Sequence, residues 1–357
     1  MRMTTRAGST TITVTRIDQN TAKKVHKQLT AGRGFTVQIR CSEGEFYDRF
    51  QQLTAKVAKC TDYGLDIFPI CMYPSTYYGV SDGRHPVSAG KYMAFEITNK
   101  DCEEYNYGIR FAKREFNDFK KYIGKALKGA EKSYEQLQNT NLDFGMTAES
   151  LKAQTDKAKQ TLKQLRELNK YLTKTKFRNL SEAMRARILL EVAGKSWGKT
   201  SMRYSSSGHA RITFKSLYQR NAQGVCAWYA QLTCKMCAAF HIGDYNYLEG
   251  ILVGEDHAVT QIKVKTLGGK TRYAILSNGN ISTSYNHYAG YTARLVPDVY
   301  KHHRVSYTLT KINQKKQQLK HIIITSGNRS MTHIVDGEIV SSNSLTIYKF
   351  DLSRSEW

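Results

Sequence analysis

Residues 221–240 read NAQGVCAWYAQLTCKMCAAF, and this stretch decides the fold class of the second half of the chain. The small and polar residues before Cys226 suit a turn, and the apolar run that follows has the length of a helix. Period-two or apolar runs come after it, at YLEGILV, AVTQIKV, RYAILS, RVSYTLT, HIIITS, THIVDGEIV and SLTIYKF. One helix followed by several antiparallel strands predicts an α+β domain over residues 210–357.

Cys226 has three interpretations: a core thiol, a metal ligand together with Cys234 and Cys237, or a nucleophile. The predicted turn places it in the first turn of the helix. The free N–H groups and partial positive charge of a helix N-terminus stabilise a thiolate and lower the pKa of the thiol. The same N–H groups can face a developing oxyanion. This position favours the nucleophile.

A nucleophilic cysteine needs a base that is oriented by a third polar group. Residues 257–277 predict a β-hairpin, in which AVTQIKV and RYAILS pair across the turn TLGGKT. His257 opens the first strand, and Asn278 and Asn280 close the second. Antiparallel pairing therefore brings the asparagine end opposite the histidine end, where a carboxamide can accept the ring N–H of the histidine.

The three segments together resemble the papain-like cysteine proteases. Gln223-Gly224-Val225-Cys226 with Trp228 is similar to the family's cysteine motif. His257-Ala258-Val259 and the strand from Tyr273 to Asn278 are similar to its histidine and asparagine motifs, in the same order along the chain. CAWYA also resembles the cysteine motif of the peptidoglycan-cleaving branch. The resemblance covers residues 215–285.

The resemblance implies a cysteine protease or amidase that hydrolyses an amide bond through a thioester and uses no cofactor. Cys226 would be the nucleophile, His257 the general base, and Asn278 the orienting residue, with Asn280 as the alternate. The backbone N–H of Cys226 would bind the oxyanion with Gln219 or Gln223. Because only 31 residues separate Cys226 from His257, we expect a compact version of the fold.

A metal site is the weaker interpretation of the cysteines. Cys234 and Cys237 form a C-x-x-C inside the predicted helix, and no second pair stands at zinc-finger spacing. His241 follows Cys237 by four residues, which still leaves only Cys226 as a fourth ligand. We therefore expect no metal and predict that Cys234 and Cys237 pack in the core.

A second enzyme class stays open as an alternative. Ser282-Thr283-Ser284 and Asp336-Gly337-Glu338 look like the Ser-Thr-Ser and Glu-x-Glu elements of ADP-ribosyltransferase toxins, with Arg220 as the leading arginine. A third alternative is a non-enzymatic basic protein that binds nucleic acid or a membrane.

The first half of the chain predicts two further parts. Residues 1–105 form an α+β unit, with strands at TTITVTRI and GFTVQIRC and helices at QNTAKKVHKQL and FYDRFQQLTAKVAKC. Residues 106–193 form a helical hairpin or bundle. An apolar stripe starts at Phe116, a second helix is capped by Thr147, and a third covers SEAMRARILLEVAG. Residues 194–209 are rich in Gly and Ser and suit a linker.

Charge and composition limit the partners and the compartment. The chain has 54 Lys+Arg and 30 Asp+Glu, and residues 105–200 hold 21 basic and 10 acidic residues. The helices of that part are either a solvated surface or a docking surface for an anionic membrane or acidic partner. Weak aromatic interleaving disfavours nucleic acid.

We expect neither a signal peptide nor a transmembrane segment, because no apolar run is long enough for either. The odd number of cysteines, seven, does not suggest a disulfide framework. These features predict a cytoplasmic protein, or one exported by a route without a cleaved signal. With the charge, they fit a bacterial toxin or effector that acts on a target-cell protein.

Overall fold

The structure is a computed structural model. It describes residues 10–72, 85–142, 145–186, 188–189, 202–204, 213–224, 226–242, 249–253, 257–265, 271–277, 280–281, 294–295, 323–326, 330–335 and 338–341. For Ala183, Tyr204, residues 226–231, Cys234 and the strands after residue 242 this description covers the backbone alone. Helices and small sheets alternate along the chain, so the predicted α+β class is confirmed.

The N-terminal unit contains the two strands and two helices that its sequence predicted, as β1, β2, α1 and α2, and four further elements that it did not. Its four-stranded sheet has the order β1-β2-β4-β3, with β1 and β2 parallel and the other pairs antiparallel. The side chain of Asp18 caps the first helix by accepting from the Thr21 N–H at 2.8 Å. The elements are β1 (Thr10–Val14), α1 (Gln19–Thr30), β2 (Phe35–Ile39), η1 (Glu43–Glu45), α2 (Phe46–Ala58), α3 (Phe68–Met72), β3 (Val87–Ala89) and β4 (Tyr92–Ile97).

The helix α4 (Asn99–Gln138) is 40 residues long and joins the N-terminal unit to a helical hairpin. It begins at a capping box, in which the Thr98 hydroxyl accepts from the Asp101 N–H at 3.2 Å. Our prediction began the apolar stripe at Phe116 and so missed the first half of the helix. That half is buried on a broad face, which produces no narrow stripe in the sequence. The predicted domain boundary at residue 105 therefore falls inside one continuous helix.

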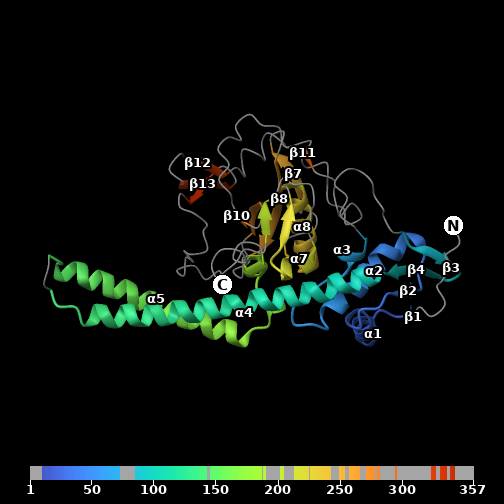
Figure 1. The fold of residues 1–357 in the computed structure, drawn as a ribbon, viewed down its shortest axis with the longest axis horizontal. Helices are drawn as coiled ribbons and strands as arrows, with labels where there is room; N and C mark the ends of the chain where they lie inside the picture. Colours follow the sequence, from blue (N-terminus) through green and yellow to red (C-terminus); the bar gives the residue numbers. More distant parts are fainter. Residues whose placement is uncertain are drawn as a thin grey trace.

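α4 packs against the antiparallel helix α5 (Ala148–Lys174), so the predicted hairpin is confirmed. Figure 1 shows the two helices extending together beyond the rest of the protein as an arm. Thr147 caps α5 as predicted, accepting from the Ser150 N–H at 3.1 Å. Leu162, Leu165, Leu168 and Leu172 of the predicted stripe are buried. Among the described residues, no helix is both long and apolar enough to cross a membrane.

The arm offers a prediction about its stability. Gly129 is exposed in the interior of α4, and an added Cβ there would meet no atom within 4 Å. Gly129→Ala should therefore raise the free energy of unfolding by about 0.5–1 kcal/mol, because alanine loses less backbone entropy in a helix. Urea denaturation measures the change. Gly108→Ala is the matched control: its Cβ would lie 3.0 Å from Leu65 Cδ2, so it should give no such gain. Equal gains at the two positions would contradict this account.

The remaining described elements follow α5. They are η2 (Phe177–Asn179), α6 (Glu182–Ala186), β5 (Met202–Tyr204), α7 (Phe214–Tyr218), β6 (Ala222–Gly224), α8 (Cys226–Ala239), β7 (Glu249–Val253), β8 (His257–Lys265), β9 (Thr271–Ser277), β10 (Asn280–Ile281), β11 (Arg294–Leu295), β12 (Ile323–Ser326), β13 (Ser330–Val335) and β14 (Glu338–Ser341). A five-stranded sheet has the order β10-β9-β8-β7-β11, and β12-β13-β14 form a separate sheet. The predicted linker contains β5, which pairs in parallel with β6.

Candidate active site

The helix α8 begins at Cys226, as the sequence predicted. It follows directly after the short strand β6, which ends at Gly224. The first four N–H groups of any α-helix have no partner within the helix and carry partial positive charge. The backbone thus places Cys226 where a thiolate and an oxyanion are both stabilised. The side chain of Cys226 lies outside the described residues.

The predicted hairpin is present, and His257 is the first residue of β8. β8 pairs with β9 in antiparallel register, with Thr260 opposite Leu276 and Lys265 opposite Thr271. β9 ends at Ser277, so this end of the strand lies at the His257 end of β8. Asn278 lies outside the described residues.

Asn280 is described and continues the same end of the sheet. It begins β10 and pairs with Ser277, the last residue of β9. The backbone of Asn280 therefore lies at the end of the sheet where β8 begins, with β9 between β10 and β8. This placement keeps Asn280 available as the orienting carboxamide that we predicted as the alternate to Asn278.

The helix and the sheet pack together. α8 contacts β7, β8 and β9, and its contact with β8 is the most extensive of the three (Figure 1). The helix that starts at Cys226 is thus layered on the strands that carry His257 and lead to Asn280. Nothing in the described residues gives the distance between the sulfur of Cys226 and the ring of His257, so the catalytic triad remains a prediction.

The two glutamines predicted for the oxyanion site lie just before α8. Gln219 is the exposed C-cap residue of α7, and its N–H donates to the Lys215 carbonyl at 2.9 Å. Gln223 is half-buried in β6, where it pairs with Arg203 of β5. Either side chain is close to Cys226 along the chain, and the structure does not choose between them.

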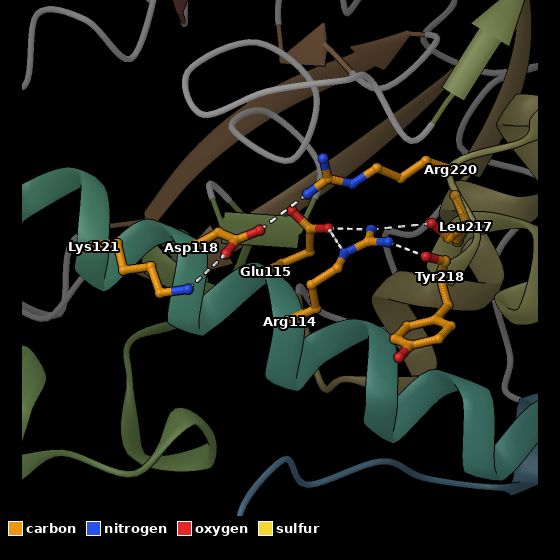
Figure 2. Close-up of polar contacts among 7 residues, drawn as sticks. All are labelled: Arg114, Glu115, Asp118, Lys121, Leu217, Tyr218 and Arg220. Atoms are coloured by element: carbon orange, nitrogen blue, oxygen red, sulfur yellow. Dashed lines mark hydrogen bonds and ion pairs between the residues drawn. The ribbon is translucent and has the colours of Figure 1, made fainter.

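The segment before α8 is held on α4 by a cluster of charged residues (Figure 2). Arg114 of α4 donates from Nη2 to the Leu217 carbonyl at 3.0 Å and from Nη1 to the Tyr218 carbonyl, which lie in the last turn of α7. Its Nε also donates to Oε1 of Glu115 at 2.7 Å, and the Glu115 side chain is fully buried. A guanidinium with a paired carboxylate therefore caps the C-terminus of α7.

A second ion pair in the same cluster fixes the turn after α7. Arg220 Nη2 donates to Oδ2 of Asp118 at 3.0 Å, as Figure 2 shows. Arg220 has a positive φ of 56°, a backbone region that non-glycine residues seldom occupy. The ion pair and the turn together direct the chain from α7 into β6.

Arg220 was also the leading arginine of the ADP-ribosyltransferase alternative. Of the other residues of that alternative, Ser282-Thr283-Ser284 and Asp336 lie outside the described residues.

The C-terminus of α8 is anchored by Arg185 and by the turn that follows the helix. The buried side chain of Arg185, from α6, donates from Nε to the Phe240 carbonyl at 3.1 Å and from Nη2 to the His241 carbonyl. The Ile242 N–H donates back to the Cys237 carbonyl at 2.7 Å, with His241 at a positive φ of 53°. These bonds form the usual left-handed end of a helix.

A buried carboxyl, Asp66, lies at this end of α8. Its backbone N–H donates to the Ala239 carbonyl at 2.5 Å, and its Oδ1 accepts from the Phe68 N–H at 2.9 Å. Burial raises the pKa of Asp66 and lowers the pKa of His241, and each group partly offsets the shift of the other. The helix end is therefore tied to the N-terminal unit as well as to α6.

A lysine in the middle of α8, Lys235, interacts with the carboxylate of Glu104 on α4. Burial lowers the pKa of Lys235, and the carboxylate of Glu104 opposes that shift. Burial likewise raises the pKa of Glu104, whose Oε2 accepts from the Phe214 N–H at 2.9 Å. Since Phe214 begins α7, the same carboxylate links α4 to both α7 and α8.

Of the two cysteines that we predicted to pack in the core, Cys237 does so. Cys237 is completely buried in α8, and Cys41, Cys60, Cys71, Cys102 and Cys237 are all free thiols. Within the described residues, no group of three or more His, Cys, Asp or Glu could hold a metal ion. The side chain of Cys234 lies outside them.

Sequence reasoning missed the charged residues that hold α7 and α8. Arg114 and Glu115 stand between the apolar residues Phe111 and Phe116 of α4, and a charged pair inside an apolar stripe is the signal that could have identified them. Arg185 gave no such signal, because its partners are backbone carbonyls, and the two at the end of α8 are 55 and 56 residues away.

The chain matches no protein-family model. Comparisons with curated proteins and with solved structures likewise found no match. A functional assignment therefore depends on the residues and arrangement of this chain alone.

Proposed function

We propose that the chain is a papain-like cysteine hydrolase that cleaves an amide bond. The observation that carries this proposal is the start of α8 at Cys226, on a helix layered against the strand that begins at His257. A nucleophilic cysteine at a helix N-terminus, on a helix packed against a strand that begins with a histidine, is an arrangement that thiol hydrolysis can use.

The reaction would proceed in two steps. The thiolate of Cys226 attacks the substrate carbonyl, and the oxyanion accepts hydrogen bonds from the Cys226 N–H and from Gln219 or Gln223. The His257 imidazolium then donates its proton to the leaving amine, which leaves a thioester on the sulfur. His257 next removes a proton from water, which attacks the thioester and releases the acid and the free thiol. Asn278 or Asn280 would hold the imidazole in the required tautomer.

The other described cysteines lack this environment. Burial raises the pKa of the Cys41 and Cys60 thiols, and it raises the pKa of Cys102 to about 12. Cys71 and Cys237 are fully buried in the core. A small electrophile therefore has one favoured target if Cys226 is activated, and this makes a discriminating experiment practical.

We predict that iodoacetamide at pH 6.5 labels Cys226 at least 10-fold faster than Cys41 or Cys60. An activated thiolate is already ionised at this pH, whereas a buried thiol or a free one with a pKa of about 8.5 is almost wholly protonated. Mass spectrometry of peptides after timed labelling measures each rate within one sample, so Cys41 and Cys60 are internal controls. A Cys226 rate no faster than theirs would overturn the hydrolase proposal and favour a non-enzymatic binding protein.

The substrate class follows from separate assays of the same protein. We propose a protein or peptide substrate, as expected for an effector that acts inside a target cell, and peptidoglycan is the alternative. Release of peptides from a denatured protein mixture, lost in Cys226→Ala, supports the first. Release of amino groups from purified peptidoglycan, lost in the same variant, supports the second. Hydrolysis of NAD that survives Cys226→Ala but is lost in Glu338→Ala would favour the ADP-ribosyltransferase alternative instead.

A further inference from the structure

A row of four lysines follows one face of the arm. Lys121, Lys125, Lys128 and Lys132 of α4 are all exposed, and their spacing of four, three and four residues keeps them on one side of a helix. This side is directly opposite the buried Ile123, which faces α5. We call these four residues the lysine row. Over eleven residues it extends about 16 Å along the helix axis.

The nearby acidic residues do not neutralise the lysine row, because arginines outside the row pair with them. Glu131 is engaged by Arg166 of α5 at 3.2 Å, on the flank of the hairpin. Asp118 lies 3.8 Å from Lys121 at one end, but its other oxygen pairs with Arg220 at 3.0 Å, and the Lys121 side chain is 77% exposed. Lys125 and Lys128 have no acidic residue three or four positions before or after them, apart from Glu131, which follows Lys128 by three.

Two glycines flank the lysine row. Gly124 and Gly129 lie on either side of it, and an added Cβ at either position would meet no atom within 4 Å. Figure 1 shows α4 and α5 extending together as an arm, and Figure 2 shows that the row starts at Lys121 beside Asp118, where Arg220 meets α4. Because the four lysines are exposed among the described residues, one extended anionic partner can contact several of their ammonium groups at once.

We propose that the lysine row docks the protein on the anionic surface of a lipid bilayer. Lysine is a hydrated point charge suited to diffuse attraction, whereas arginine is favoured for bidentate recognition of single phosphates, and the row contains no arginine. Between Lys121 and Lys132, the other residues on this side of α4 are Gly124 and Gly129, so it lacks the aromatic groups on which single-stranded nucleic acids stack. A straight row on a projecting helix fits a plane. This proposal does not depend on the hydrolase activity.

The test compares two variants of the full chain that lose equal charge from opposite faces of the arm. One replaces the lysine row, as Lys121→Gln, Lys125→Gln, Lys128→Gln and Lys132→Gln. The control replaces four exposed lysines of α5, as Lys152→Gln, Lys159→Gln, Lys163→Gln and Lys170→Gln. Because all eight side chains are exposed, both variants should fold, and circular dichroism with thermal melting verifies this.

Binding is measured by sedimentation with vesicles of phosphatidylcholine containing 30% phosphatidylserine, in about 0.1 M salt. One lysine near an anionic leaflet gives roughly a fivefold gain in affinity, so we expect the lysine-row variant to lose at least about 30-fold and the α5 control to lose less than about fivefold. Binding should also fall steeply in 0.5 M salt and be absent with pure phosphatidylcholine.

Three results would overturn the proposal. One is no binding of the wild type to anionic vesicles; a second is equal loss in the two variants, which would mean attraction by net charge alone. The third is binding to a duplex or single-stranded oligonucleotide, lost in the lysine-row variant, without binding to vesicles. That result would assign the row to nucleic acid.

Discussion

Replacing Arg114 with alanine is expected to lower the free energy of unfolding by about 3 kcal/mol. Arg114 bonds to the fully buried carboxylate of Glu115 and to two carbonyls at the end of α7 (Figure 2). Truncation removes the positive charge from beside a buried negative charge, which costs far more than the loss of an exposed ion pair. It also removes the two hydrogen bonds that Arg114 donates to the Leu217 and Tyr218 carbonyls at the end of α7.

Arg110 provides a matched control one helical turn away. It is an exposed arginine of the same helix, and its guanidinium lies over the Tyr107 ring at 5.2 Å. Arg110→Ala should therefore change the free energy of unfolding by less than about 1 kcal/mol. Chemical denaturation of the two variants under identical conditions measures both values. Similar losses in both would contradict a special role for the buried pair.

The double variant Arg114→Ala, Glu115→Gln separates the charge from the packing. If the uncompensated carboxylate causes most of the loss, neutralising it should recover at least about 1 kcal/mol relative to Arg114→Ala alone. No recovery would mean that the carbonyl bonds to α7 account for the stability. In that case labelling of Cys226 should also slow, because α7 leads into the segment before α8.

The sequence predicted the N-terminal unit and the hairpin because their structure follows from local patterns. Period-two alternation and amphipathic periodicity mark β1, β2, α1 and α2, and the cap at Thr147 is a short-range signal. The start of α4 was missed because its first half is buried on a broad face, where Cys102, Tyr105 and Phe111 leave no single stripe. The capping box at Thr98 was the available signal.

For the candidate site, the sequence predicted where α8 and β8 begin and how β8 pairs with β9. These features depend on residues within one helix or one hairpin. It did not predict the anchoring of α7 and α8 on α4, because Arg114 and Arg220 reach partners about a hundred residues away in the chain. It also assigned the strand β5 to a linker, since three residues carry no periodicity and β5 forms only by pairing with β6.

Replacing His257 with alanine is expected to slow the alkylation of Cys226 at pH 6.5 by roughly a hundredfold, if the thiolate exists as an ion pair with the imidazolium. Without a positive partner, a thiol with a pKa of about 8.5 is roughly 1% ionised at this pH. With the partner, ionisation is nearly complete, so the ratio of rates reports the ion pair directly.

A pH profile of the alkylation rate distinguishes the histidine from the helix N-terminus as the source of activation. The wild type should show a rate plateau that extends well below pH 7, whereas His257→Ala should show one rise near pH 8.5. His85→Ala, which changes an exposed histidine of the N-terminal unit, should keep the wild-type profile. If His257→Ala also keeps the plateau, the helix N-terminus alone lowers the pKa of Cys226, and His257 is not its catalytic partner. If neither protein shows a plateau, Cys226 is not activated and the backbone arrangement of α8 and β8 serves the fold alone.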